Sequence, residues 1–357
     1  MTLRLPRIPL LASSFQTENY MYWLITNRNI EANGFGTTFA DVTYWTAPAD
    51  ADPKQKASWS QETKDSFRAK LVAVADTFPP PTTTQPADQK HITFLVHGYN
   101  NSWSDAMGLY QRVATSMYSG ANGLGECISF DWPSKGDLMG YLPDRSQARQ
   151  SAEDFADVLS DLYDWLLIKE NAAAKDVNNA CKAKTSLIAH SMGNYVFQCA
   201  MNYTWTKKNR PLLVSLVHEA LMVAADVDND LFRSGEVVES GDGEGIANLT
   251  YRITALYSGR DAVLGVSSGL KHFGKRRLGR SGLDQTTALP DNVWDIDCTN
   301  LIHPDVSGIS VHGSYFFPDE SDCYPLMREL LRGIDRSVLI AKGMVPSALS
   351  KTQTVGS

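Results

Sequence analysis

The stretch TSLIAHSMGN, residues 185–194, carries the strongest structural signal in the chain. Its apolar run predicts a buried strand that ends at Ala189, and a helical pattern begins at Gly193. A serine at the apex of such a strand–turn–helix unit is exposed above the end of a sheet. The tight turn needs small residues two places before and two places after the serine, where Ala189 and Gly193 stand. Ser191 is therefore the candidate nucleophile, although Ala189 replaces the first glycine of the usual pattern Gly-x-Ser-x-Gly.

Short apolar runs alternate with longer amphipathic segments on both sides of this unit. The predicted strands are 92–96, 127–130, 185–189 and 251–257, and the predicted helices are 103–118, 146–170 and 193–206. Two further apolar runs, 213–217 and 221–225, bracket another buried element. Near-continuous apolar strands separated by helices are typical of a parallel sheet covered on both faces. Right-handed crossovers make such a sheet doubly wound, and ligands bind at the carboxyl ends of its strands.

The N-terminal part of the chain has a different pattern. Aromatic and β-branched residues at 20–27 and 42–46 predict strands, which we expect to pair antiparallel. Helical spacing predicts an amphipathic helix over 61–77. The proline- and threonine-rich stretch at 79–89 then predicts a linker or an exposed loop.

These patterns predict one main domain. Residues 1–90 supply the N-terminal strands, the helix and the linker that lead into the sheet, and residues 91–341 form the α/β core. We expect 20–90 to belong to the same domain as this core. Residues 342–357 are expected to form a flexible tail.

Charge and composition exclude several classes of protein. Lys and Arg number 33 and Asp and Glu number 40, so the net charge is −7 and no bulk attraction for nucleic acid is expected. No apolar stretch approaches the roughly 18 residues of a membrane-spanning helix. The N-terminal apolar patch is short and broken by Pro6 and Pro9, so we expect no signal peptide and a cytoplasmic location. Five scattered cysteines without a CxxC pair predict neither a disulfide framework nor a zinc site.

A second polar motif, His97-Gly98-Tyr99-Asn100-Asn101, follows the strand predicted at 92–96. A loop of this kind after an early strand supplies one backbone N–H to an oxyanion hole, and the residue after the nucleophile supplies another. The amides of Tyr99 and Met192 are therefore the candidate donors, each able to contribute roughly 3–4 kcal/mol to transition-state stabilisation. The simpler interpretation of His97-Gly98 is a turn that ends a strand.

A serine hydroxyl becomes an effective nucleophile when a base takes its proton and a carboxylate orients that base. The expected order along a chain of this architecture is serine, acid, histidine. Asp261 lies in a turn after the strand predicted at 251–257, and His312 lies in a loop before the final helix. Asp261 and His312 are therefore the candidate acid and base.

Each role has a competitor. The strict Gly-x-Ser-x-Gly pattern occurs at 265–269, but only a short apolar run precedes Ser267 and no packed helix is predicted after it. Asp226 and Asp228 are alternative acids, although we favour a solvated turn for them. His303 is the rival base.

The segment 132–145, WPSKGDLMGYLPDR, mixes aromatic and aliphatic residues with glycine and proline. We interpret it as a cap or wall over the serine that offers apolar contacts, and an ordinary exposed loop is the equal alternative. The candidate substrate-binding residues are His97, Trp132, Leu138 and Tyr141. The basic cluster between 271 and 280 is interpreted as a solvated charge run.

Taken in order, these segments resemble the α/β-hydrolase superfamily, and within it the bacterial branch catalogued as domain of unknown function nine hundred. The resemblance covers roughly residues 20–320 and rests on the segments 24–29, 94–106, 130–136, 185–194, 257–264 and 305–316. It implies the α/β-hydrolase fold, with a mostly parallel doubly wound sheet and antiparallel N-terminal strands. It also implies hydrolase chemistry with Ser191 as nucleophile, Asp261 as acid and His312 as base.

The sequence thus predicts a serine hydrolase, esterase- or lipase-like, that cleaves carboxylic esters through an acyl-enzyme. We expect a small-molecule ester or lipid as its substrate and neither a metal nor an organic cofactor. The same triad would serve a thioesterase, an amidase or an acyltransferase. A binding protein that keeps the fold without catalysis is the alternative from another class.

Overall fold

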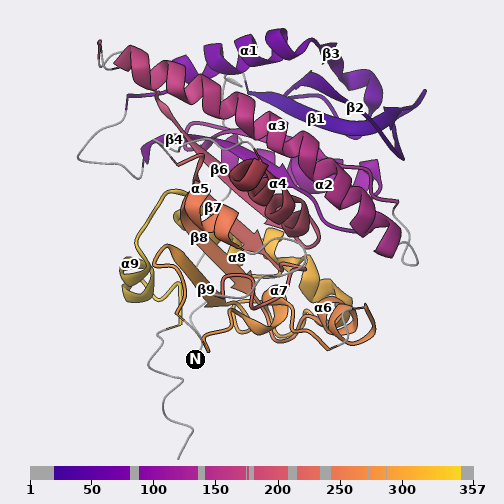
Figure 1. Ribbon diagram of the computed structural model, residues 1–357, viewed down its shortest axis with the longest axis vertical. Coiled ribbons are helices and arrows are strands. Elements are labelled where there is room, and N and C mark those ends of the chain that lie inside the picture. The colour runs from indigo at the N-terminus through magenta and orange to yellow at the C-terminus, as the bar shows by residue number, and fades with distance from the viewer. Residues whose placement is uncertain are drawn as a thin grey trace, which may run out of the picture.

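A computed structural model of the chain describes its main body. The described residues are 20–80, 88–135, 141–173, 175–176, 181–207, 215–233, 243–271, 274–286 and 288–346. A single twisted sheet runs through this body, with helices on both sides (Figure 1).

Within the described residues, nine strands form one sheet in the order β3-β2-β1-β5-β4-β6-β7-β8-β9. Its strands are β1 (Met21–Ile30), β2 (Phe35–Pro48), β3 (Ser60–Glu62), β4 (Lys90–Val96), β5 (Gly125–Asp131), β6 (Ala183–His190), β7 (Val217–Val223), β8 (Thr250–Tyr257) and β9 (Val293–Asp297). The pairs β1–β2 and β2–β3 are antiparallel, and all other neighbours are parallel. The mostly parallel sheet with antiparallel N-terminal strands is therefore confirmed, and strands from before residue 90 belong to the same sheet as the rest.

Helices cover both faces of the sheet (Figure 1). One face packs against α1 (Lys64–Asp76), α3 (Tyr141–Ala173), α4 (Gly193–Lys207) and α5 (Glu244–Leu249), and the other against α2 (Trp103–Val113), α8 (Cys323–Leu331) and α9 (Arg336–Ala341). Two short helices, α6 (Ala262–Val266) and α7 (Leu278–Ser281), follow β8. None of the helices in the described part of the chain combines the length and the hydropathy needed to cross a bilayer.

Three strands differ from the sequence expectation: β3 (Ser60–Glu62) occupies the first residues of the helix predicted over 61–77, and β7 and β9 differ as follows. The apolar runs at 213–217 and 221–225 contribute to a single strand, β7, in which His218 and Glu219 interrupt the apolar pattern; residues 213–214 lie outside the described residues. The edge strand β9 was not predicted, because its sequence VWDID is short and carries two acids. Polar residues are tolerated there because an edge strand has a neighbour on one side only.

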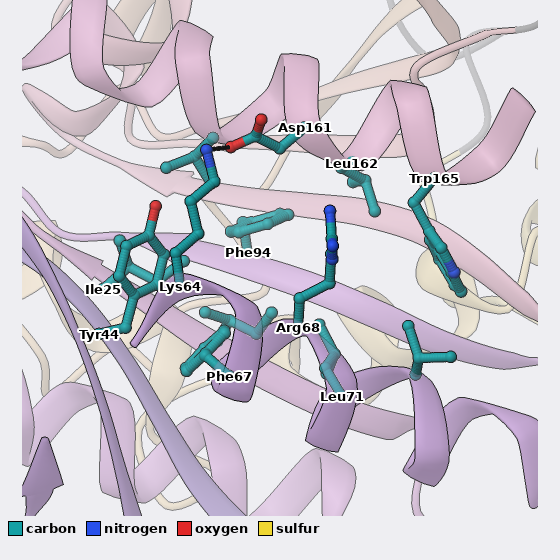
Figure 2. Close-up of a pocket in the computed structure, with 13 residues that line it drawn as sticks. Ile25, Tyr44, Lys64, Phe67, Arg68, Leu71, Phe94, Asp161, Leu162 and Trp165 are labelled. Atoms are coloured by element: carbon teal, nitrogen blue, oxygen red, sulfur yellow. Dashed lines mark ion pairs between the residues drawn. The ribbon is translucent and has the colours of Figure 1, made fainter. Parts of the chain in front are cut away.

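Packing between α1 and α3 leaves an apolar cavity of about 70 Å³ above the middle of the sheet (Figure 2). Strand residues Ile25, Phe94 and Ile128 line it, together with helix residues that include Val158 and Leu162. Side chains that border such a gap lack part of their dispersion contacts, so this cavity is a weak point of the core.

We expect Val158→Ile to raise the free energy of unfolding by up to about 0.8 kcal/mol, because one added methylene would occupy the cavity. Leu162→Ala should lower it by about 2–5 kcal/mol, because it enlarges the same space. Urea unfolding measures both changes. The matched control is Val338→Ile, on the exposed side of α9, where the added methylene stays in solvent; a stabilisation equal to that of Val158→Ile would contradict the prediction.

Candidate active site

Ser191 occupies the sharp turn between β6 and α4. Its backbone φ is 54°, in the left-handed region that costs a non-glycine residue roughly 1–2 kcal/mol. The Ser191 N–H donates to the carbonyl of Val223 at 3.0 Å, and the Asp226 N–H donates to the carbonyl of Ser191 at 3.1 Å. The side-chain amide of Asn194 donates to the carbonyls of Ala189 and Ser191, at 2.9 and 3.1 Å. The strained serine is therefore held from both sides of the turn.

Two glycines let neighbouring backbone approach this turn closely. A Cβ atom on Gly193 would lie 2.5 Å from the carbonyl oxygens of Val96 and His97. A Cβ atom on Gly98 would lie 2.6 Å from the Cβ of Ser191. The turn and the loop after β4 therefore touch without any side chain between them, which brings the amides of Tyr99 and Met192 to one region.

His312 and Asp261 form a direct pair. His312 Nδ1 lies 2.7 Å from Asp261 Oδ2, and the Asp261 side chain is completely buried. Asp261 also caps α6, because its Oδ1 accepts from the N–H of Leu264 at 2.9 Å. Burial of the His312 ring lowers its pKa, but the Asp261 carboxylate opposes this effect and leaves the pKa of His312 above its usual value.

His190 joins the serine turn to the loop that carries His312. Its Nε2 donates to the backbone carbonyl of His312 at 3.0 Å, and the two ring centroids are 4.9 Å apart. Burial lowers the pKa of His190 to about 3, so the ring is neutral. Ser191 and His312 therefore lie on adjoining loops at one end of the sheet, and the contact between these loops runs through His190. No sequence motif predicts this role for His190.

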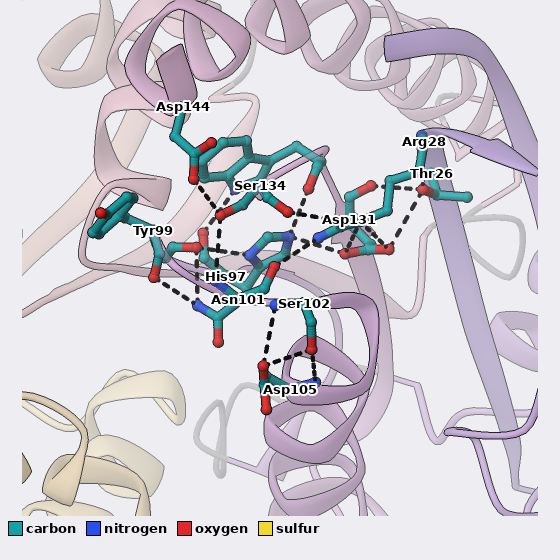
Figure 3. A network of polar contacts seen from close by, with 12 residues as sticks. Thr26, Arg28, His97, Tyr99, Asn101, Ser102, Asp105, Asp131, Ser134 and Asp144 are labelled. Atoms are coloured by element: carbon teal, nitrogen blue, oxygen red, sulfur yellow. Dashed lines mark hydrogen bonds and ion pairs between the residues drawn. The ribbon is translucent and has the colours of Figure 1, made fainter. Parts of the chain in front are cut away.

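A buried ion pair fastens the loop after β4 (Figure 3). Arg28 Nε donates to Asp131 Oδ1 at 3.0 Å, and both side chains are completely buried. Nη1 donates to the carbonyls of Gly36 and Ser134, each at 3.1 Å, and Nη2 donates to the carbonyl of Asn101 at 3.1 Å. One side chain thus joins the loops after β4 and β5 to strand β2.

Asn101 secures the same loop from within (Figure 3). Its side-chain amide donates to the carbonyls of Gly98 and Tyr99, at 2.9 and 3.1 Å. Its backbone N–H donates to Ser134 Oγ at 3.3 Å. No sequence pattern predicts this contact, because it depends on a loop closure that local sequence does not encode.

His97 and Trp132 lie in the interior, with 2% and 0% of their surface exposed. His97 Nε2 lies 2.9 Å from Asp131 Oδ1, and its Nδ1 lies 2.9 Å from the Gly98 carbonyl oxygen. The ring of His97 stacks on Trp132 at 5.2 Å, and Trp132 Nε1 donates to the His97 carbonyl at 2.9 Å. Both side chains are therefore buried and contact the loop from the interior of the protein.

The segment 132–145 is described only in part. Leu138 and the rest of 136–140 lie outside the described residues. Tyr141 begins α3 and is buried; its hydroxyl donates to Asp226 Oδ2 at 2.7 Å, and its ring lies 5.4 Å from that of Tyr99.

Asp226 and Arg277 form a buried ion pair, so the solvated environment expected for these two residues is wrong; Lys275 and Arg276 of the basic cluster are exposed, as expected for a solvated charge run. Arg277 is completely buried, and its Nε donates to Asp226 Oδ1 at 2.9 Å; its Nη1 also contacts Asp228. Burial raises the pKa of the Asp226 carboxyl. Arg277 and the other polar partners of Asp226 together lower it by more, so the pKa lies below its usual value. The opposite charges of Asp226 and Arg277 compensate each other, which permits the burial of both side chains.

The competing serine and histidine make other contacts. Ser267 follows the last residue of α6, not a strand, and its hydroxyl donates to Asp226 Oδ1 at 2.9 Å. His303 Nδ1 lies 3.1 Å from the carbonyl oxygen of Asp319. The structure thus brings His312, and not His303, to Asp261.

The two serine motifs provide a matched test of backbone packing. We expect Gly193→Ala to lower the free energy of unfolding by about 1–3 kcal/mol, because its Cβ would meet two carbonyl oxygens. Gly269→Ala, at the equivalent place after Ser267, should change it by less than about 0.5 kcal/mol, because nothing lies within 4 Å of the new Cβ. Urea unfolding of both variants measures the difference; equal losses would contradict the close approach at Gly193.

Comparison with known proteins identifies the family. Residues 82–317 match the family described as alpha/beta hydrolase of unknown function (DUF900). A putative hydrolase from Agrobacterium vitis S4 is a similar solved structure, with 14% identity, a TM-score of 0.34 and coverage of 92% of this chain and 99% of that chain. Esterase B from Lactobacillus rhamnosis is another, with 9% identity, a TM-score of 0.38 and coverage of 92% and 91%. No curated protein matches the sequence. Because the family match spans more than half of its length, the chain belongs to the alpha/beta hydrolase family of unknown function.

Proposed function

We propose that the protein is a serine hydrolase that cleaves carboxylic esters through an acyl-enzyme. The observation that carries the proposal is the 2.7 Å pair of His312 with the buried Asp261, on a loop that contacts the residue before Ser191. The left-handed backbone of Ser191 supports it, because strain of this kind concentrates at functional turns. Membership of a hydrolase family agrees with this chemistry.

In the proposed reaction, His312 takes the proton of the Ser191 hydroxyl through Nε2 while Asp261 holds its Nδ1–H. The Ser191 oxygen attacks the ester carbonyl and forms a tetrahedral intermediate. His312 then gives the proton to the departing alcohol, which leaves Ser191 acylated. A water molecule, activated by the same histidine, attacks the acyl group and releases the acid.

Negative charge on the tetrahedral oxygen would be held by the backbone N–H groups of Tyr99 and Met192. The N-terminal end of α4, a helix of 15 residues, adds partial positive charge at the same place. The contacts of Arg28, His97 and Asn101 with the loop after β4 support this role, because donors must be held in place before the reaction to lower its barrier. We therefore assign His97 and Trp132 to support of the oxyanion loop.

Positive charge that develops on His312 is favoured by its surroundings. Asp261 is buried beside it, and the neutral His190 adds no opposing charge. The raised pKa of His312 follows from this arrangement and keeps the imidazolium stable while the intermediate exists.

Ser191→Ala should abolish ester hydrolysis and labelling by a fluorophosphonate, while thermal unfolding stays nearly unchanged, because the variant loses only the nucleophilic oxygen. Ser267→Ala, in the strict motif, is the matched control and should keep both activities. Hydrolysis of 4-nitrophenyl esters and mass spectrometry of the labelled protein measure the outcome. If the folded wild type takes no label, the protein is a binding protein and not an enzyme of this type. If only Ser267→Ala loses activity, Ser267 and not Ser191 is the nucleophile.

The rate should depend on pH through His312, which acts as a base only when deprotonated. Because its pKa is raised, kcat/KM should fall with decreasing pH through a midpoint above about 6.5. Asp261→Asn removes the raising charge, so the midpoint should move to lower pH while kcat falls by about 10⁴-fold. Asp319→Asn, which removes an exposed carboxylate, should leave the midpoint in place. An unmoved midpoint in Asp261→Asn would reject the pairing.

The same triad chemistry would serve thioesters, amides and acyl transfer. A panel of esters, thioesters and amides with a common acyl group, tested with and without an added alcohol, ranks these reactions by kcat/KM. We expect the esters to rank first.

A further inference from the structure

A groove of about 300 Å³ opens beside the candidate site along one face of α2. The end near the site is lined by Asn101, His190 and Gly313. Asn101 belongs to the loop after β4, and His190 and Gly313 are the chain neighbours of Ser191 and His312. Lys54 and Arg112 line the other end, next to the last turns of α2. The groove is therefore placed to receive the part of a substrate that extends away from the reacting carbonyl.

The far end of the groove is positively charged. The Arg112 guanidinium lies over the ring of Phe317 at 3.9 Å, which fixes it on the groove wall. Lys54 approaches Gly108, one turn before Arg112, where its Cε lies 3.2 Å from the place of a Cβ on that glycine. Glycine at this position leaves room for the lysine stem.

Neither side chain forms an ion pair with a carboxylate among the described residues. Other exposed or half-buried cations of the chain do form ion pairs, for example Lys64, Lys70, Lys169, Lys275, Arg332 and Lys342. Two cations without a carboxylate partner in one groove make this end locally positive, although the chain has a net charge of −7. They favour an anion at this end.

Asp105 is the acid that lines the groove, and it is already engaged. Its Oδ2 accepts from the N–H and from the hydroxyl of Ser102, at 3.1 and 2.6 Å, in the cap of α2. Seven residues of helix separate Asp105 from Arg112, which corresponds to about 10 Å. The carboxylate at the near end of the groove is thus engaged in the cap of α2, whereas the cations lie about two turns further along the helix.

Resting on the proposed function, we infer that Lys54 and Arg112 bind an anionic group at the far end of the substrate. The favoured substrates are esters whose acyl chain ends in a carboxylate and is long enough to run along the two turns of α2 between Asp105 and Arg112. A guanidinium already stacked on an aromatic ring loses little freedom when it donates two hydrogen bonds to a carboxylate, so Arg112 suits this role better than a mobile side chain.

The test compares two 4-nitrophenyl esters of equal acyl length, the suberate half-ester with a terminal carboxylate and the octanoate with a terminal methyl group. We expect wild type to favour the suberate ester about tenfold in kcat/KM, mainly through KM, and the preference to shrink as NaCl is added. In Lys54→Met/Arg112→Gln the preference should fall to about unity or reverse, with octanoate hydrolysis kept. Lys175→Met, which removes an exposed charge beyond the far end of α3, is the matched control and should keep the preference.

Binding of the suberate ion, measured by calorimetry, gives a readout that needs no turnover. Wild type and Ser191→Ala should bind it, and the double variant should bind at least about tenfold more weakly. Equal hydrolysis of the two esters by wild type, or a preference that survives in the folded double variant, would overturn the inference and leave the proposed function standing. Failure to hydrolyse either ester or to take the fluorophosphonate label would reject the proposed function, and the suberate binding would then decide the groove alone.

Discussion

The ion pair of Arg28 and Asp131 is the contact on which the site depends most. Both side chains are completely buried, so water compensates neither charge. Such a pair is tolerated only when further hydrogen bonds satisfy both partners, and removal of one partner typically costs about 3–5 kcal/mol. Arg28 meets this requirement with three backbone carbonyls from three chain segments, and Asp131 meets it with His97. The need to solvate a buried charge thereby fixes the loop that carries Tyr99.

A second buried pair, Arg277 with Asp226, holds the opposite side of the serine turn. The backbone N–H of Asp226 donates to the Ser191 carbonyl, so the pair and the strained serine share one residue. A left-handed serine persists only where its surroundings over-determine it. The two buried ion pairs, one on each side of the turn, supply that constraint. This role explains why two arginines are fully buried near one serine.

Local patterns predicted the sheet and the order of the candidate site residues. The unit around Ser191 could be identified because strand, turn and helix follow one another within ten residues, and the strands at 92–96, 127–130 and 251–257 lie inside β4, β5 and β8. Contacts between distant segments were not accessible in the same way. Asp226 and Arg277 each stand among polar residues, which indicated solvent until the fold brought the two charges together. Trp132 resembled a substrate contact because an aromatic residue after a strand has the same local appearance whether it faces a ligand or a buried histidine.

The loop that carries His312 also forms a wall of the groove. Phe316 packs its ring against His190 at 5.3 Å, while the next residue, Phe317, lies under the Arg112 guanidinium. One short segment therefore carries His312 and contacts the Arg112 guanidinium. A change at Phe317 would therefore affect both the position of His312 and the binding of the anionic group. Only residues outside this segment can change the binding of the anionic group without an effect on catalysis. Lys54 and Arg112 lie on other segments, before α1 and on α2, so natural variation at these two positions can alter the charge of the bound group while the pair of His312 and Asp261 stays intact.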